Sequence, residues 1–125
     1  MPGQPATVRP RRILLIEDNA DAREAMCALL ELDGHDVQAA PDGPQGLELA
    51  RTKRPEIVLI DIGLPGMDGF EVARRMRALG QPVVLVALTG YGQPEDRRRT
   101  QDAGFDAHLV KPVDPADLTH ALARF

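Results

Sequence analysis

The sequence feature that most constrains the fold is an unbroken aliphatic run at residues 57–60 that ends in a carboxylate, Asp61. A run of this length with β-branched residues predicts a strand buried on both faces, as in parallel sheets that helices cover. Glycines and a proline follow between residues 63 and 69, and they predict a tight loop instead of an immediate helix. We therefore expect Asp61 to lie in a crevice at the carboxyl end of a central strand, where open α/β sheets bind ligands.

Four further apolar segments predict strands, at residues 11–16, 35–40, 82–89 and 107–110. Capped or amphipathic segments predict helices at residues 21–33, 44–52, 72–79, 94–103 and 115–125. Strands that alternate with helices and lack hairpin signals indicate a parallel sheet covered on both faces and built from right-handed crossovers. The expected fold class is therefore α/β, a doubly wound five-stranded parallel sheet.

Local patterns predict which residues of these elements are buried. The first helix has one apolar stripe, formed by Ala22, Ala25, Met26, Leu29 and Leu30. In the weaker strand at residues 35–40, Val37 and Ala39 share one face. Asp114 predicts the cap of the last helix. The helix at residues 94–103 is mostly polar, so we expect it to be loosely held.

The length of 125 residues with 43% hydrophobic content suits one domain with a real core and is too short for two. Residues 1–10 contain three prolines and a glycine and have little to bury. We therefore expect a tail or linker remnant at residues 1–10, followed by a single domain at residues 11–125. The proline-rich start and abrupt end favour a domain cut from a longer chain.

Charge and cysteine content exclude several classes of protein. The net charge of −4 argues against direct binding of nucleic acid, and the basic run at residues 97–99 is typical of a solvated helix face. Cys27 is the only cysteine, so no intramolecular disulfide can form, and we expect Cys27 to pack against the core. No apolar run reaches the roughly 18 residues that span a bilayer, and the N-terminus lacks the apolar core of a signal peptide. We expect a cytoplasmic protein that does not bind membranes directly.

The carboxyl ends of parallel strands lie on one edge of a sheet, so their terminal polar residues are expected to converge. These residues are Glu17 and Asp18, Asp61, Thr89 and Lys111. Three carboxylates within a few ångströms of one another would repel, so the cluster requires a cation. An all-oxygen site of this kind suits Mg²⁺ together with a phosphoryl group. Lys111 and Thr89 are suited to surround the phosphoryl oxygens of an acyl phosphate on Asp61.

Four motifs occur in the order ILLIEDN, VLIDIGLPGMDG, VALTGYG and HLVKP. In this respect the chain, over about residues 12–124, resembles the receiver domain of two-component response regulators. The resemblance implies that Asp61 accepts a phosphoryl group from a phosphohistidine on a sensor histidine kinase or a histidine phosphotransfer domain. It also implies that Asp18, Asp61 and the Gly63 carbonyl bind Mg²⁺, and that Glu17 acts on the metal through water.

The resemblance further implies a flavodoxin-like (βα)5 fold with strand order 2-1-3-4-5 and a cis peptide between Lys111 and Pro112. It casts Thr89 as the switch hydroxyl and Lys111 as the base that pairs with phosphate. A hybrid sensor kinase is one kind of longer chain from which such a domain could come.

Two positions depart from the most familiar receiver pattern. His108 stands three residues before Lys111, where a switch aromatic is common, and Tyr91 stands two residues after Thr89, where many relatives have a smaller residue. We expect phosphorylation to alter the surface of the last two helices and the last strand through Thr89. His108 is the side chain expected to change rotamer, so that a partner or a second copy in a homodimer meets a different face.

Three alternative functions conflict with particular residues. A phosphatase of the haloacid dehalogenase type would carry a second acid two residues after the nucleophile, where this chain has Gly63. A flavodoxin-like FMN carrier would need hydroxyls and glycines after the first strand, where EDNADA would repel phosphate. A non-phosphorylated scaffold receiver would lack part of the acid, threonine and lysine set. The expected protein is therefore not an enzyme in the usual sense, because it catalyses only its own phosphorylation and dephosphorylation.

Overall fold

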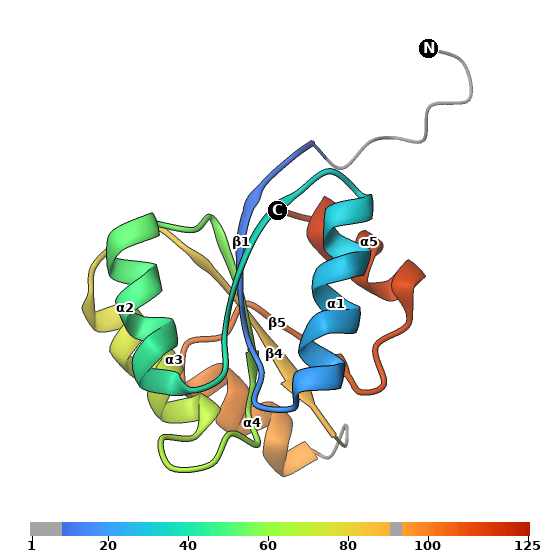
Figure 1. The fold of residues 1–125 in the computed structure, drawn as a ribbon. Helices are drawn as coiled ribbons and strands as arrows, with labels where there is room; N and C mark the ends of the chain where they lie inside the picture. Colours follow the sequence, from blue (N-terminus) through green and yellow to red (C-terminus); the bar gives the residue numbers. More distant parts are fainter. Residues whose placement is uncertain (1–8, 91–93) are drawn as a thin grey trace.

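The computed structural model describes residues 9–90 and 94–125 (Figure 1). Its five parallel strands are β1 (Arg12–Ile16), β2 (Asp36–Ala40), β3 (Ile57–Asp61), β4 (Val84–Thr89) and β5 (Ala107–Val110). Its five helices are α1 (Ala20–Leu32), α2 (Gly43–Lys53), α3 (Gly69–Ala78), α4 (Pro94–Asp102) and α5 (Pro115–Ala123). The strand order β2-β1-β3-β4-β5 confirms the fold class and the order that the resemblance implies.

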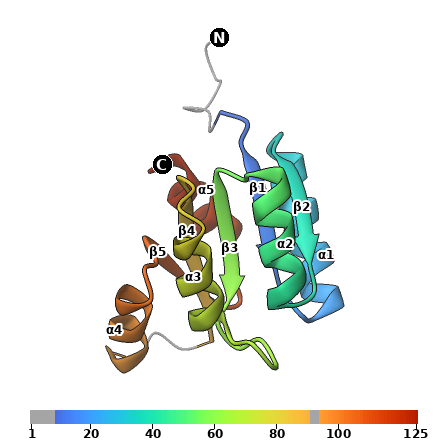
Figure 2. The same ribbon diagram turned by 90° about the vertical axis from the view of Figure 1, so that its left-hand side faces the viewer.

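Helices cover both faces of the sheet, with α2 and α3 on one face and α1 and α5 on the other (Figures 1 and 2). Each strand sends alternate residues into one of two cores. The core beneath α2 and α3 contains Leu14, Ile16, Val58, Ile60, Leu85 and Ala87 from the strands. The core beneath α1 and α5 contains Ile13, Leu15, Ile57, Leu59, Val86 and Leu88. Burial on both faces explains why the central strands are continuous apolar runs.

Side-chain caps set where four helices begin. The carboxylate or amide oxygens of Asn19, Asp42, Asp68 and Asp114 each accept a hydrogen bond from a backbone N–H in the first turn of α1, α2, α3 and α5. Asp114 confirms its predicted role, whereas the other three caps were not predicted. The sequence suggested that Gly69 belongs to the loop. It is instead the first residue of α3, because Asp68 caps that helix.

Two residues on the predicted apolar faces receive little cover. Ala25 on α1 is exposed, and so is Ala39 on β2, whereas the neighbouring Ala40 is buried. Val37 and Ala39 do share one face, since they lie in register with Ile13 and Leu15 of β1. β2 is an edge strand with β1 on one side only, so its residues receive less cover than those of a central strand. Cys27 is half-buried against the core beneath α1 and α5, which confirms its packing role.

Two other predictions fall wholly or partly on residues that the structure does not describe. Of the predicted tail, only Arg9 and Pro10 lie within the described residues, and both are exposed; Tyr91 lies outside them.

Near the end of α4, Thr100 is buried, and so is Ala103 just after the helix, so this end of the polar helix is packed against the domain. Loose attachment of α4 stays a prediction.

The amino ends of the strands form what we call the amino rim, which comprises Arg11, Arg12, His35, Arg54 and Glu56. His35 is buried, and its Nδ1 accepts a hydrogen bond from the Arg11 backbone N–H at 3.0 Å. The guanidinium of Arg12 donates to the Arg54 carbonyl at 3.0 and 3.3 Å, and the Arg12 backbone N–H donates to Glu56 Oε1 at 3.1 Å. These bonds connect segments that precede three different strands.

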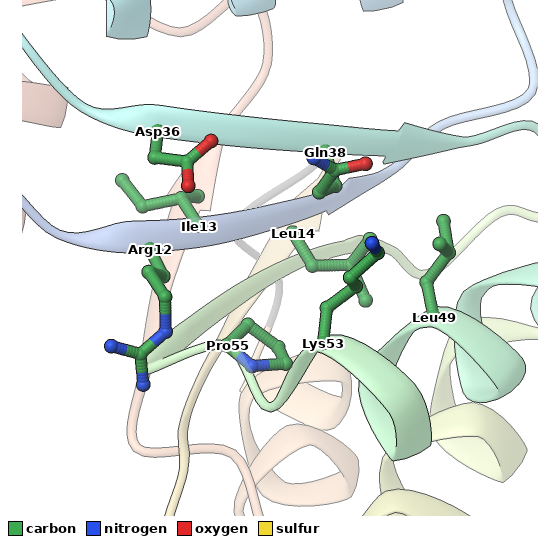
Figure 3. A pocket seen from close by; sticks show the side chains of 8 residues that line it. All are labelled: Arg12, Ile13, Leu14, Asp36, Gln38, Leu49, Lys53 and Pro55. Carbon is green, nitrogen blue, oxygen red and sulfur yellow. The ribbon is translucent and has the colours of Figure 1, made fainter.

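A cavity of about 150 Å³ opens beside this rim, between β1, β2 and the end of α2 (Figure 3). Its charged lining residues are Arg12, Asp36 and Lys53, which approach it from three different elements. None of the candidate site residues lines it, because they lie at the opposite ends of the strands.

Candidate functional site

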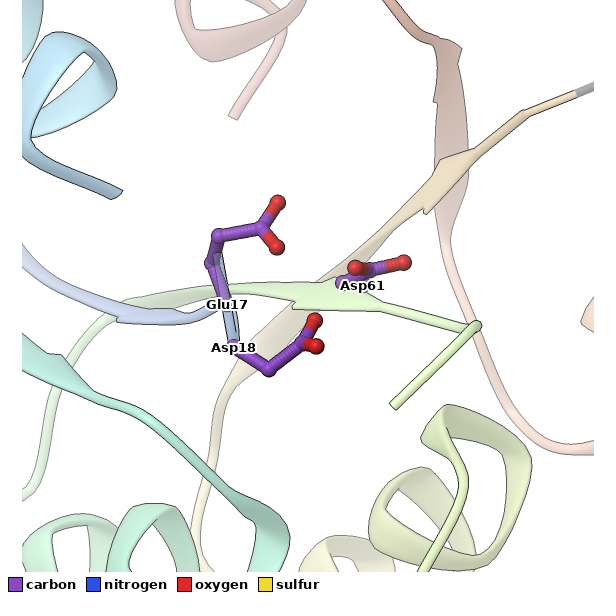
Figure 4. Close-up of side chains that lie close together, drawn as sticks. All are labelled: Glu17, Asp18 and Asp61. Atoms are coloured by element: carbon purple, nitrogen blue, oxygen red, sulfur yellow. The ribbon is translucent and has the colours of Figure 1, made fainter. Parts of the chain in front are cut away.

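The structure brings the predicted acidic residues together at the carboxyl ends of the strands, which we call the carboxyl rim. Glu17 and Asp18 directly follow β1, and Asp61 is the last residue of β3. Their carboxylates converge (Figure 4), with one oxygen from each lying within 4.8 Å of the others. Glu17 and Asp61 are buried, whereas Asp18 is exposed, so the cluster opens to solvent on the Asp18 side.

Lys111 supplies positive charge to this cluster from the residue after β5. Its ammonium donates to Glu17 Oε1 at 2.8 Å and to Asp61 Oδ2 at 3.1 Å. One ammonium therefore faces three carboxylates, and the site retains net negative charge that favours a further cation.

For each partner of this ion pair, burial and hydrogen bonding shift the pKa in opposite directions. Burial raises the pKa of Glu17 above its usual value, although the Lys111 ammonium and the Asn19 N–H both oppose the rise. Burial lowers the pKa of Lys111, but its hydrogen bonds to Glu17 and Asp61 outweigh that effect and leave its pKa raised. Lys111 is therefore a fixed ammonium at neutral pH, available to pair with anionic oxygens.

Backbone groups hold the carboxylates in place. The Gly63 N–H donates to Asp61 Oδ1 at 2.9 Å, and the Asn19 N–H donates to Glu17 Oε2 at 3.1 Å. Arg23 of α1 donates to the Glu17 carbonyl at 2.9 Å and so fixes the turn after β1. Sequence reasoning missed Asn19 and Arg23; the residue type of Asn19, directly before a helix, was a signal for the cap.

Thr89 and Lys111 are joined through the backbone at the same rim. The Lys111 N–H donates to the Thr89 carbonyl at 2.6 Å, and the peptide between Lys111 and Pro112 is cis, as the resemblance implies. The Thr89 side chain is buried, and its hydroxyl donates to the Leu109 carbonyl at 3.5 Å. At that distance the hydrogen bond is weak, so the hydroxyl can be drawn to a stronger acceptor at low cost.

His108 does not lie within the carboxyl rim. It is half-buried on β5 and lies in register with Ala87 of β4. It lines a hollow of about 330 Å³ beside α5, together with Asp117 and His120. The structure thus places His108 on the outermost strand, toward the surface that was predicted to change.

The donor set fits a Mg²⁺ ion, because hard carboxylate oxygens from Glu17, Asp18 and Asp61 gather within 4.8 Å of one another. Exposure of Asp18 leaves room for water ligands, which Mg²⁺ retains in proteins. The role of the Gly63 carbonyl as a ligand stays a prediction.

An apolar groove of about 460 Å³ runs from the carboxyl rim along α1. Ala22, Ala25, Met26 and Leu29 line it from α1, and Pro112 and Val113 line it from the loop after β5. Glu17 and Lys111 also line it, so an object seated in the groove would touch the site. The exposure of Ala25 is explained by this groove, since no element of the described chain covers it.

Within residues 9–90 and 94–125, no helix combines the length and apolar character required to cross a membrane.

Comparisons with known proteins agree with these observations. The sequence model of one protein family, the response regulator receiver domain, matches residues 13–123. An uncharacterised 14.6 kDa protein of Leptolyngbya boryana is 35% identical, with 95% of this chain and 92% of the relative covered. The transcriptional regulatory protein AfsQ1 of Streptomyces coelicolor is 42% identical over 81% of this chain. The chain spans 44% of AfsQ1 and so less than half the length of that relative.

Solved structures show the same fold. The chemotaxis protein CheY4 of Vibrio cholerae is 28% identical with a TM-score of 0.89, and the match covers 92% of this chain and 98% of that one. The receiver domain of sensor histidine kinase PA1611 from Pseudomonas aeruginosa, described with a magnesium ion in its active site cleft, is 34% identical. Its TM-score is 0.84, and the match covers 92% of this chain and 96% of that one.

Proposed function

This chain belongs to the response regulator receiver family, and we propose that it is a signalling switch in which Asp61 accepts a phosphoryl group in a Mg²⁺-dependent reaction. The observation that carries this proposal is the geometry around Asp61. Its buried carboxylate shares the Lys111 ammonium with Glu17 and lies beside Asp18 at the end of a central strand. A nucleophile, a cationic partner and a metal-binding oxygen set thus occupy one small space.

The proposed transfer needs little from the protein beyond position and charge. An Asp61 carboxylate oxygen attacks the phosphorus of a phosphohistidine, the P–O bond forms, and the P–N bond breaks. The released imidazole takes up a proton. Lys111, already 3.1 Å from Asp61 Oδ2, is placed to pair with a phosphoryl oxygen. Bound Mg²⁺, held by Asp18, Asp61 and the Gly63 carbonyl with Glu17 acting through water, would neutralise negative charge on the phosphoryl group.

We propose that the phosphoryl donor is a sensor histidine kinase or a histidine phosphotransfer domain. The apolar groove along α1 supports this, because it can accept the apolar face of a helix and its end reaches Lys111. A helix seated there would bring a histidine on its surface next to Asp61. The relative Sporulation initiation phosphotransferase F of Bacillus subtilis, 27% identical over 91% of this chain, bears a name that indicates phosphoryl transfer.

The proposed output is a change in the surface formed by α4, β5 and α5. A phosphoryl group brings strong acceptors and about −1.5 to −2 charge to the carboxyl rim, and the weakly bonded Thr89 hydroxyl is available to turn toward it. His108 is the proposed reporter of this movement, read by a partner or by a second copy of the chain.

We further propose that the protein works in the cytoplasm and catalyses only its own phosphorylation and dephosphorylation. The half-buried thiol of Cys27, whose pKa burial raises, supports a packing role and a setting without disulfides. Gly63 at the place where a haloacid dehalogenase-type phosphatase would carry a second acid supports the limited activity.

The test is to incubate the protein with acetyl phosphate and Mg²⁺ and to measure its intact mass. Wild type is expected to gain one phosphoryl group, and Asp61→Asn is expected to gain none. Asp36→Asn, which changes an exposed aspartate near the amino rim, is the matched control and should be phosphorylated like wild type. An adduct that persists in Asp61→Asn would refute the assignment, and so would a wild type that binds neither phosphoryl group nor beryllofluoride.

A further inference from the structure

One arginine reinforces the packing of the C-terminal end of α4 against the domain. Arg77 of α3 donates from Nε and Nη2 to the Gly104 carbonyl at 2.9 and 2.7 Å, and from Nη1 to the Val83 carbonyl at 2.7 Å. Its Nη2 also donates to Asp106 Oδ2 at 2.7 Å, and the same oxygen accepts the Leu85 N–H at 2.8 Å. The point where the chain leaves α4 and enters β5 is thereby tied to both α3 and β4.

A second contact lies further along α4 toward its N-terminus. The guanidinium carbon of Arg99 lies over the Phe70 ring, 4.1 Å from its centroid, in the geometry of a cation–π interaction. Phe70 is buried in the core beneath α2 and α3, so its ring is a fixed platform, whereas Arg99 is exposed. The neighbouring Arg98 makes no such contact with the described residues, which singles out Arg99 within the basic run.

Phe70 is directly connected to the backbone of the phosphorylation site. It follows Gly69, whose N–H donates to the Ile62 carbonyl at 3.2 Å. A Cβ atom at Gly69 would lie 2.6 Å from the Asp61 carbonyl oxygen and 2.4 Å from Ile62 Cα, so α3 begins in close contact with Asp61. A shift in the Asp61 backbone therefore reaches the Phe70 platform through a single residue.

We propose that the Arg99–Phe70 stack is a latch that holds α4 in place while Asp61 is a free carboxylate. When Asp61 is phosphorylated the latch opens, and α4 turns about its Arg77-fixed C-terminal end. The inference rests on the proposed function, since phosphorylation of Asp61 is the event that opens the latch. In this structure Asp61 still shares Lys111 with Glu17, which is the pairing of a free carboxylate, and the stack is formed.

The latch predicts a thermodynamic coupling. A contact made in the free-carboxylate state and lost in the phosphorylated state stabilises the former, so its removal shifts the population toward the latter. Any ligand that selects the phosphorylated state then binds more tightly. Beryllofluoride with Mg²⁺ is such a probe, because it forms a phosphoryl-like adduct on an aspartate.

The experiment compares Arg99→Met with Arg98→Met, which removes the same charge one residue away. The apparent affinity for beryllofluoride should rise about two- to five-fold in Arg99→Met and stay unchanged in Arg98→Met. Phe70→Leu should raise it in the same direction, and the double variant should show little additional gain because both changes break one contact. Arg99→Lys, which keeps a cation, should lie closer to wild type.

Hydrogen exchange gives a readout that needs no phosphoryl analogue. In Arg99→Met the amides of α4 should exchange faster than in Arg98→Met, whereas those of Gly104 and Asp106 should keep their protection because Arg77 is intact. If Arg99→Met lowers the melting temperature and leaves the beryllofluoride affinity equal to that of Arg98→Met, the stack is merely structural and the latch is wrong. A lowered affinity would assign the stack to the phosphorylated state and also overturn the latch. If wild type itself fails to bind beryllofluoride, the proposed function fails, and the latch with it.

Discussion

Polar groups at the two rims of the sheet differ in the partners that they find within the chain. At the amino rim, Arg11 and Arg12 bond to a neutral imidazole, a backbone carbonyl and a glutamate, and the bonds join segments of the chain to one another. At the carboxyl rim, Glu17 and Asp61 share one ammonium, and an oxygen from each of them lies within 4.8 Å of an Asp18 oxygen. Hydrogen bonds at the amino rim therefore join segments of the fold, whereas the charges at the carboxyl rim remain available for ligands.

The pKa of Glu17 reflects the charges that the carboxyl rim keeps available for ligands. Burial raises it even with Lys111 at 2.8 Å, which means that the folded chain stabilises the Glu17 charge less well than water does. Interactions that a cation or a phosphoryl group would satisfy are thus left incomplete, as expected for a site whose ligands come and go.

The largest expected difference between the rims is the change in phosphorylation rate when a cation is removed from one or the other. Lys111→Met should slow phosphorylation of Asp61 by acetyl phosphate about 10²- to 10³-fold, because it removes a donor aimed at the phosphoryl oxygens. Arg12→Met, which removes a cation from the amino rim, should leave the rate unchanged. Both rates can be followed by intact mass at one Mg²⁺ concentration. Equal slowing in the two variants would show that Lys111 acts only on the fold.

A smaller effect is expected on stability. Mg²⁺ at 100 times its dissociation constant should raise the free energy of unfolding of wild type by about 2.7 kcal/mol. Asp18→Ala should fold, because the change removes a source of repulsion, but should lose this increase. Asp36→Ala should retain it. Urea unfolding with and without MgCl₂ at matched ionic strength measures the difference, and an increase that survives in Asp18→Ala would contradict the metal site.

The smallest expected effect is a pH dependence from the amino rim. Burial lowers the pKa of His35 below 6.5; the Arg11 charge acts in the same direction and Asp33 opposes it. Protonation would also place a proton on Nδ1, which accepts the Arg11 N–H. The unfolded chain therefore binds this proton more readily, so the contribution of His35 to stability is complete above pH 6.5 and is lost as the pH falls through the folded-state pKa.

His35→Asn, which keeps an acceptor but cannot titrate in this range, tests this pH dependence. The loss of stability between pH 7.5 and 5.5 should be smaller in the variant than in wild type, as measured by urea unfolding at the two pH values. An equal loss in both proteins would assign the pH dependence to other groups.

The carboxyl rim could be predicted from the sequence because its geometry follows from strand direction alone. Once the apolar runs were identified as parallel strands, their terminal residues had to meet, and Asp61 and Lys111 do meet although they lie 50 residues apart. Strand direction brings the amino ends of the strands together as well, but it does not say which polar groups will pair there. His35 and Arg11 lie 24 residues apart at the amino rim, and nothing local to either indicates its partner. The same holds for Arg77 and Asp106, which lie 29 residues apart and pair where the chain leaves α4.

Where the sequence predictions for individual helices fell short, the cause is different. The apolar stripe of α1 correctly indicates the inward side of the helix, but it cannot show that the groove beside α1 leaves Ala25 uncovered. The cap of α3 was a missed local signal, since Asp68 with Glu71 three residues later is the pattern of a helix start, and the Asp68 carboxylate accepts the Glu71 N–H at 2.9 Å. That signal would have placed Gly69 inside the helix.

Lys111 also sets the moment during synthesis at which the domain can begin to work. The carboxylates that it joins come from the first and third strands, and Lys111 itself follows the fifth, 94 residues after Glu17. A ribosome releases the N-terminal part of a chain first, so the nascent polypeptide exposes its acids well before their counter-ion exists. Until residue 111 has emerged, a phosphohistidine would meet carboxylates that lack this cation, so the proposed phosphorylation of Asp61 has to await synthesis of β5 and Lys111.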